Sequence, residues 1–484
     1  MFKLEEATIE SIQKAVAAKE ISYTELLLMY LERIAEVDSC EGGLNSVLEI
    51  NPDALVVAQL YDDRKLADMP SAPLTGIPIL LKDNINSWDK THTTAGSLAL
   101  SGSFAVGDAD IVQNLRQNGA IIFGKTNMTE FANFMSDGMT NGYSSEGGYV
   151  KSPYNRDADP SGSSTGSAVA VAANLCAASV GTETYGSIIG PACSNGIVGI
   201  KPTAGLLSGF GIIPISNTLD TAGPMARTVR DAAILLSCLE GAYNNHYYRL
   251  GILNNGAYNS TDYSKGLDRV TLRGLRIGIY AEQEEKDDEF SKAFEEAITA
   301  LEKAGAIINR DICSITPDDP WEKIGAVISK HEFKRCMDYY LAGGGMYVSA
   351  KADKSLADIV RFNEENKEKC LKYGQSVLLE CLNETESRLT EPEYIKALRT
   401  RNTLINDLNK LYDEHKLDVL IGANEYISMA PLAGFPSGTL PIGERANGIP
   451  IGLYFIARRY EEDMLINAMY ASEQLIGKRK CPRL

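Results

Sequence analysis

The sequence has no apolar run of about 18 residues, so it predicts no membrane-spanning helix. Its first residues, MFKLEEAT, lack the apolar stretch of a secretory signal, which favours a cytoplasmic location. Basic residues are also scarce, because 47 Lys and Arg face 64 Asp and Glu for a net charge of −17. Phosphate backbones are bound by clustered cations, so this balance argues against nucleic acid as a partner.

Cysteine and histidine patterns give no indication of a metal site. The nine cysteines form no CxxC pair, and their odd number disfavours a complete disulfide framework. We expect reduced, mostly buried thiols, as in a cytoplasmic protein. The four histidines, His92, His246, His331 and His415, include no HxxxH spacing. The sequence therefore predicts neither a metal nor an organic cofactor.

Residues 159–202 stand out because serine-bearing glycine turns flank an Ala-rich apolar segment there. The turns are GSSTG at 162–166, with Ser163 and Ser164, and Gly186-Ser187. No histidine lies in this stretch, so a hydrolase built on these serines needs another base. Lys82, at the end of the apolar run PILLK, is the candidate.

Helical and extended patterns alternate along all 484 residues, which is typical of an α/β fold with helices on both faces of a sheet. Apolar periodicity and caps predict helices at 6–19, 22–37, 111–118, 167–178, 227–240, 290–304, 321–340, 392–412 and 461–475. Short apolar runs predict strands at 75–82, 120–123 (ended by Gly124), 197–200, 275–280, 417–421, 438–442 and 450–456.

Lys82 has two interpretations. A lysine at a strand end is usually a surface charge. Followed by Asp83 and Asn84, it can instead belong to a polar network in a cleft. A base must be neutral near pH 7, whereas the ordinary lysine pKa is about 10.4, a difference worth about 4 kcal/mol. Burial is able to supply it.

Ser163 and Ser164 also have a structural interpretation, as the N-cap of the Ala-rich helix that follows. The pentapeptide matches a GxSxG nucleophile elbow, but a polar turn precedes it where that motif needs a core strand. A phosphate loop is excluded because no Gly-Lys-Ser/Thr follows. Ser187 ends a turn whose successive N–H groups can form an anion-binding nest for an oxyanion.

Together these segments resemble the amidase signature family over most of the chain. The resemblance is carried by GIPILLKDNI (76–85), TTAGSLA (93–99), GKTNMTEFAN (124–133), GSSTGS (162–167) and GIKPT (199–203). It implies a large twisted mixed β-sheet and a Ser–cis-Ser–Lys triad. Ser187 would be the nucleophile, Ser163 the bridging serine on a cis peptide bond, and Lys82 the general base and acid.

The resemblance implies further roles around this triad. The N–H groups of Thr184, Tyr185, Gly186 and Ser187 would form the oxyanion hole. Ser164 and Asp83 would support the lysine network. Substrate-binding positions are expected at Phe134, Met135, Tyr185 and Ile189.

The nucleophile segment departs from the usual family pattern. Ile189 replaces the common Arg in ETYGSII (183–189), which resembles the branch that contains peptide amidases. FANF (131–134), Gly147-Gly148, Asn155 and APLAGFP (430–436) also resemble that branch. Tyr185 stands where the branch has Asp, so its side chain is expected to affect the pocket rather than the chemical step.

We therefore expect one domain, with N-terminal helices at 1–60, a catalytic core at 61–240, a variable helical segment at 242–415 and a return to the core at 416–484. The expected activity is hydrolysis of a small or C-terminal peptide amide to acid and ammonia by a monomer or homodimer. Two alternatives are the amidase-like component of a tRNA-dependent amidotransferase and a non-catalytic binding protein on the same fold.

Overall fold

The computed structural model describes residues 2–64, 72–241, 261–280, 288–344, 347–348, 355–423, 425 and 427–484. The first part of the predicted variable segment, 242–260, lies outside these residues. No helix in the described ranges is both long and apolar enough to cross a membrane.

Among the described residues, eleven strands form one mixed sheet, as the sequence predicted for the fold class. In spatial order they are β1 (Val47–Ile50), β4 (Ile121–Thr126), β2 (Pro78–Lys82), β7 (Ala178–Glu183), β9 (Thr221–Ala226), β8 (Val198–Lys201), β14 (Ser437–Glu444), β15 (Pro450–Ile456), β13 (Val419–Gly422), β10 (Arg276–Tyr280) and β11 (Ile307–Asn309). The centre is antiparallel, while β4–β2–β7 and β13–β10–β11 are parallel. Two small ribbons pair β3 (Phe104–Ala105) with β12 (Tyr347–Val348) and β5 (Tyr143–Ser144) with β6 (Gly148–Tyr149).

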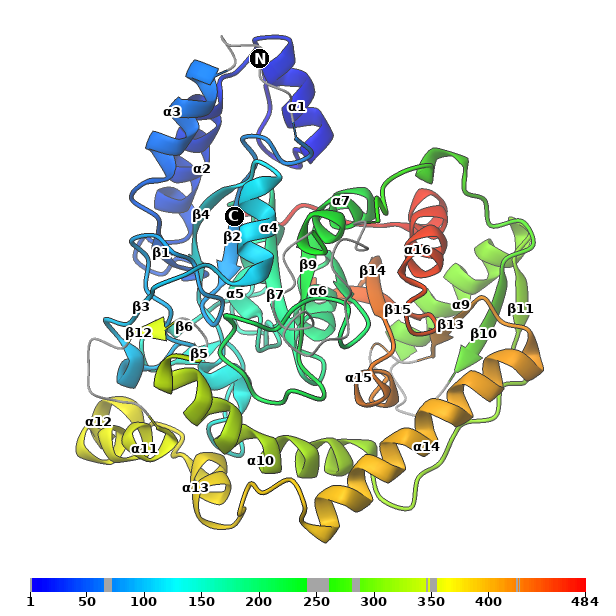
Figure 1. Cartoon of the computed structure of the whole chain (residues 1–484). Helices are drawn as coiled ribbons and strands as arrows, with labels where there is room; N and C mark the ends of the chain where they lie inside the picture. Colours follow the sequence, from blue (N-terminus) through cyan, green and yellow to red (C-terminus); the bar gives the residue numbers. More distant parts are fainter. Residues whose placement is uncertain are drawn as a thin grey trace, which may run out of the picture.

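Helices cover both faces of the sheet (Figure 1). Register places Gly438 opposite Ile200 and Thr439 opposite Gly199, so Gly438 and Gly199 face opposite sides. Gly199 lies against α6, and Gly438 lies against Met469 of α16. The helices that pack around the sheet are α4 (Asp110–Gln117), α5 (Thr165–Ala172), α6 (Ile189–Ser194), α7 (Val229–Leu239), α9 (Asp288–Lys303) and α16 (Glu462–Ile476).

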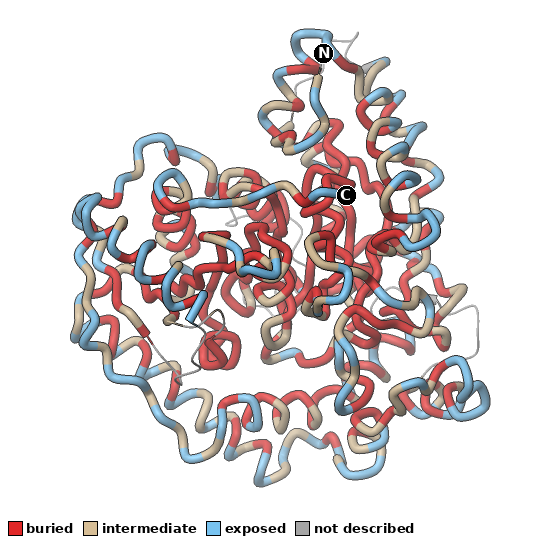
Figure 2. Tube along the Cα trace, turned by 180° about the vertical axis from the view of Figure 1, so that it is seen from behind, coloured by how far each residue is buried: buried red, intermediate tan, exposed pale blue. Residues whose placement is uncertain are grey.

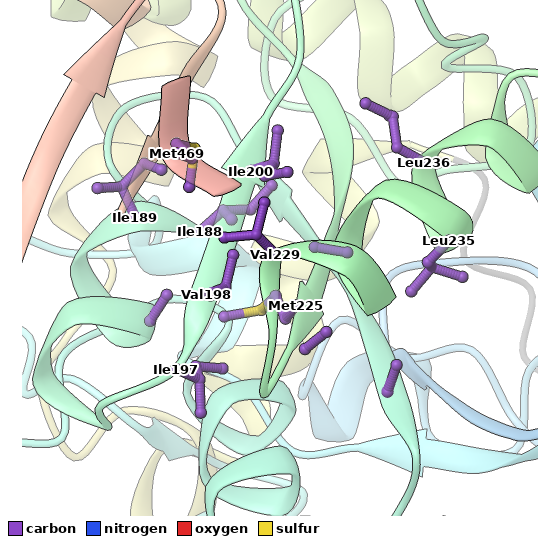
Figure 3. Packing of buried hydrophobic residues seen from close by; sticks show 14 of the residues in the cluster. Ile188, Ile189, Ile197, Val198, Ile200, Met225, Val229, Leu235, Leu236 and Met469 are labelled. Atoms are coloured by element: carbon purple, nitrogen blue, oxygen red, sulfur yellow. The ribbon is translucent and has the colours of Figure 1, made fainter. Parts of the chain in front are cut away.

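The main core lies between these layers, and the buried residues concentrate at the centre of the molecule (Figure 2). Around β8 and β9, Ile200, Met225 and Val229 pack with Leu235 and Leu236 of α7 (Figure 3). The strands are buried along their whole length because helices cover both faces, so their sequences are continuous apolar runs rather than alternating ones.

Two groups of helices lie outside this sandwich. The N-terminal helices α1 (Ile9–Ala17), α2 (Tyr23–Val37) and α3 (Ala54–Arg64) project beyond one end of the sheet (Figure 1). On another side lie α10 (Trp321–Tyr339), α11 (Leu356–Glu365), α12 (Lys367–Cys370), α13 (Ser376–Asn383), α14 (Pro392–His415) and α15 (Met429–Ala433). Helices α10, α11 and α13 share a second, smaller core with 95–100, 128–135 and 213–215.

Gly124 does not end its strand, contrary to the sequence prediction. Strand β4 continues to Thr126 because it pairs with both β1 and β2 along its length. A Cβ at Gly124 would lie 2.2 Å from the carbonyl oxygen of Glu49. Glycine is therefore the residue that lets β1 approach at this point, and it marks a close contact rather than a break.

Candidate active site

Lys82 lies at the carboxyl end of β2, between parallel β4 and β7, and it is fully buried. Its Nζ donates to Ser163 Oγ at 2.8 Å, Ser164 Oγ at 2.9 Å and the carbonyl oxygen of Thr182 at 3.1 Å. This burial excludes the surface-charge interpretation. The structure thus brings together the lysine and two serines that lie about 80 residues apart in the sequence.

The turn at 162–166 presents both serines to the lysine. The Gly162–Ser163 peptide bond is cis, as the resemblance implies. Ser164 is the N-cap of α5, but its hydroxyl makes no capping hydrogen bond. Instead it donates to the Thr182 carbonyl oxygen at 3.0 Å and receives the Lys82 bond. The capping position and the contact with Lys82 therefore coexist, and the hydroxyl serves the latter.

Ser187 lies in the turn between β7 and α6 and is 8 % exposed. Its carbonyl oxygen accepts the N–H of Ser164 at 3.1 Å, which joins the two serine-bearing turns. Within the described hydrogen-bond network, none joins the hydroxyls of Ser163 and Ser187. The two turns are held together by the backbone, while the hydroxyl of Ser187 remains directed by its own rotamer.

The four residues expected to form the oxyanion hole follow β7 directly. Gly186 has φ +84°, a left-handed conformation that glycine adopts without strain. The N–H groups of Gly186 and Ser187 donate to no acceptor in the part of the chain that the structure describes. Successive unengaged N–H groups in a tight turn can stabilise a developing negative charge.

Glu183, for which the sequence patterns predicted no role, fixes this turn from behind. Its Oε2 accepts the N–H groups of Ile188 at 2.7 Å and Ile189 at 3.1 Å. A carboxylate here satisfies the first N–H groups of α6 and complements the positive end of the helix. Its position at the end of β7, four residues before Ser187, is a signal that the sequence offered.

The electrostatics suit a lysine that changes protonation near neutral pH. Burial lowers the pKa of Lys82 to about 7, and the carboxylates of Glu183 and Asp220 act in the opposite direction. Desolvation disfavours the ammonium form, whereas nearby negative charge favours it. Burial is the larger influence, so a substantial fraction of Lys82 is neutral at physiological pH.

Asp220 is a second residue for which the sequence patterns predicted no role. Its Oδ1 accepts the hydroxyl of Thr184 at 2.6 Å, and its Oδ2 accepts the N–H groups of Ile215 and Ser216 at 2.7 and 2.9 Å. Burial raises the pKa of this carboxyl to about 6. Asp220 thereby ties the loop before β9 to the turn that bears Ser187.

Asp83 supports the site at one remove from Lys82. Its Oδ2 accepts the hydroxyl of Thr94 and the N–H of Gly96, the latter at 3.0 Å. Burial raises the pKa of Asp83 to about 6, although nearby Lys125 opposes this. Asp83 anchors the 94–96 segment beside the site rather than contacting the ammonium itself.

A cavity of about 580 Å³ opens beside the nucleophile turn. Residues 182–184 form one wall, 209–218 form another, and α10 with the following turn closes a third. The cavity thus adjoins the expected oxyanion hole, where the acyl part of an amide would extend.

The four residues predicted to bind substrate are not among the described residues that line this cavity. Phe134 packs against Phe333 with ring centroids 5.0 Å apart, and Met135 is buried in the same second core. Ile189 is buried among apolar side chains (Figure 3). Tyr185 is partly buried against α10, where a Cβ at Gly325 would lie 2.8 Å from its ring. Their substrate-binding roles stay predictions.

Comparisons with known proteins agree with this geometry. The family model described as Amidase matches residues 25–466. A probable amidase of Arabidopsis thaliana is 36 % identical over 100 % of this chain and 92 % of its own. The amidase-like component of the glutamyl-tRNA(Gln) amidotransferase of Methylobacillus flagellatus is 32 % identical over 97 % of this chain and 96 % of its own. The native peptide amidase of Stenotrophomonas maltophilia superimposes with a TM-score of 0.90 at 37 % identity, covering 99 % of this chain and 98 % of that one.

Proposed function

Because the chain belongs to the amidase family, we propose that it hydrolyses a carboxamide, a C-terminal peptide amide or a related small amide, to a carboxylate and ammonia. The observation that carries the proposal is the 2.8 Å contact between the buried Nζ of Lys82 and Ser163 Oγ. A buried lysine whose pKa is close to 7 can exchange protons with a serine at physiological pH.

In the proposed reaction, Ser187 Oγ attacks the amide carbonyl carbon. Ser187 gives its proton to Ser163 as Ser163 gives its own to neutral Lys82. The carbonyl oxygen becomes an oxyanion, which the N–H groups of Thr184, Tyr185, Gly186 and Ser187 would stabilise. The hydroxyl of Ser187 must turn toward Ser163 for the first transfer.

The tetrahedral intermediate then loses its amine. The C–N bond breaks while the Lys82 ammonium returns a proton through Ser163 to the nitrogen, which leaves as ammonia. The product is an ester between the acyl group and Ser187. Water attacks this ester with the same groups in reverse, and the carboxylate is released. No cofactor takes part in the proposed steps.

The choice of a hydrolase over an amidotransferase component rests on the comparisons and on Ile189. The peptide amidase structure matches at 37 % identity, and the amidotransferase component matches at 32 %. A non-catalytic binding role is disfavoured by the presence of Lys82, Ser163 and Ser187 together. We also propose the cytoplasm as its location, since the nine cysteines are unpaired.

A screen of small amides and amidated dipeptides, with ammonia release as the readout, tests the proposal. We expect turnover of at least one class, and loss of at least about a thousandfold in kcat for Lys82→Ala or Ser163→Ala. Co-purification of a second protein, with no amide hydrolysed by the chain alone, would favour the amidotransferase alternative.

A further inference from the structure

The cavity beside the nucleophile turn has an unusual charge distribution. The Asp, Glu, Lys and Arg side chains that line it are three carboxylates, Glu183, Asp220 and Glu332, and one guanidinium, Arg335. Glu183 and Glu332 are 1 % and 3 % exposed and Asp220 is partly buried, whereas Arg335 is exposed on α10. Negative charge therefore lies in the wall, and the positive charge lies where water screens it.

Two of the carboxylates are joined by one residue. Ser216 donates its N–H to Asp220 at 2.9 Å and its hydroxyl to Glu332 at 2.5 Å. Glu332 also accepts the N–H of Thr218 at 3.0 Å and the hydroxyl of Tyr394 at 2.7 Å. All these donors are neutral, so they hold the carboxylates in place without cancelling their charge.

The charge has no cation beside it in the described residues, because neither Asp220 nor Glu332 forms an ion pair there. Glu183 adds a further signal, since its Oε1 is buried and accepts no hydrogen bond from any described residue. The Oδ1 of Asn84, on another lining residue, is in the same condition. Unsatisfied buried acceptors around a cavity indicate that a donor group belongs inside it.

We propose that this cavity is a subsite for a positively charged group in the acyl part of the amide substrate, such as the ammonium of a lysine-like side chain. The inference rests on the proposed amidase function, because it places the scissile carbonyl at Ser187. A partly desolvated cation between Asp220 and Glu332 is attracted more strongly than in water. An acidic side chain is repelled by the same wall.

The test uses two substrates that differ in one charge, N-acetyl-L-lysinamide and N-acetyl-L-norleucinamide. We expect kcat/KM to be at least about tenfold higher for the lysine compound. Glu332→Gln removes one charge with little change of shape and is expected to reduce that ratio to within about threefold of one. Glu322→Gln is the matched control, because Glu322 is exposed on the same helix and lies outside the cavity lining. Its ratio is expected to match the wild type.

Binding measurements separate this inference from the function itself. Calorimetry on Ser187→Ala measures the affinity of both amides without turnover, and tighter binding of the lysine compound is expected. Equal affinities, or a preference for N-acetyl-L-glutamic acid α-amide that Arg335→Gln abolishes, would overturn the subsite. If the affinities differ as expected while no amide is hydrolysed by the wild type, the subsite stands and the proposed amidase function fails.

Discussion

The Nζ of Lys82 lies 2.8 Å from the hydroxyl oxygen of Ser163, at the buried end of β2. The contact joins a strand in the first quarter of the chain to a turn 81 residues later. It gives Lys82 a defined proton partner, and the shifted pKa of Lys82 makes that partnership sensitive to pH near 7.

Activity should therefore rise with pH through neutrality. Burial lowers the pKa of Lys82 to about 7, so the protonated, inactive form dominates below that value and the neutral base above it. The measurement is kcat/KM from about pH 5.5 to about pH 9. Lys82→Ala should remove both activity and the ascending limb. His92→Ala should keep both, and loss of activity in that variant would indicate a histidine base instead.

Glu183→Gln should move the ascending limb to lower pH. The Glu183 carboxylate favours the ammonium form of Lys82, so its removal lowers the lysine pKa further. The glutamine oxygen can still accept the N–H groups of Ile188 and Ile189, which keeps the turn in place. The pH profile is the readout that separates this charge effect from structural damage. A limb that stays at the wild-type pH would show that Glu183 does not act on Lys82.

Tyr185→Asp should alter substrate ranking rather than the chemical step. The ring lies against Gly325 of α10, at one end of the nucleophile turn. We expect changed relative kcat/KM among amides, with kcat for the best small amide altered by less than about tenfold. Thermal melting is the control. A large loss of stability with an unchanged ranking would mean that Tyr185 only fills space.

Gly124→Ala should destabilise the fold by about 2 kcal/mol or more, because the added Cβ would overlap the Glu49 carbonyl and separate β1 from β4. Urea denaturation measures the change. Gly209→Ala is the matched control, since a Cβ there meets no atom within 4 Å. Equal stability of the two variants would contradict the close approach at Gly124.

The Gly124 position also shows where sequence patterns stop being informative. The run 121–123 predicts a strand correctly, but only the neighbouring strands reveal that Gly124 permits a close approach. The helix expected at 167–178 ends at Ala172, because Ala178 already pairs with β2 and β9. A small-residue run fits either conformation until its partners are known.

The candidate site was predictable where one short segment carries it, and not where distant segments converge. Lys82, Ser163 and Ser187 lie in recognisable motifs, and the structure brings the first two into contact. Asp220 and Glu332 lie far apart in the sequence and become neighbours only through Ser216. The predicted pocket residues Phe134, Met135 and Ile189 are apolar residues near the motifs, yet the fold packs them in or against its cores.

Labelling with a fluorophosphonate, followed by peptide mass spectrometry, tests the central claim most directly. The reagent reacts with an activated serine and leaves a covalent adduct at that residue. The proposed mechanism predicts one adduct on Ser187, and none in Ser187→Ala or Lys82→Ala. An adduct on Ser164, or labelling that persists in Ser187→Ala, would contradict it and place the nucleophile elsewhere.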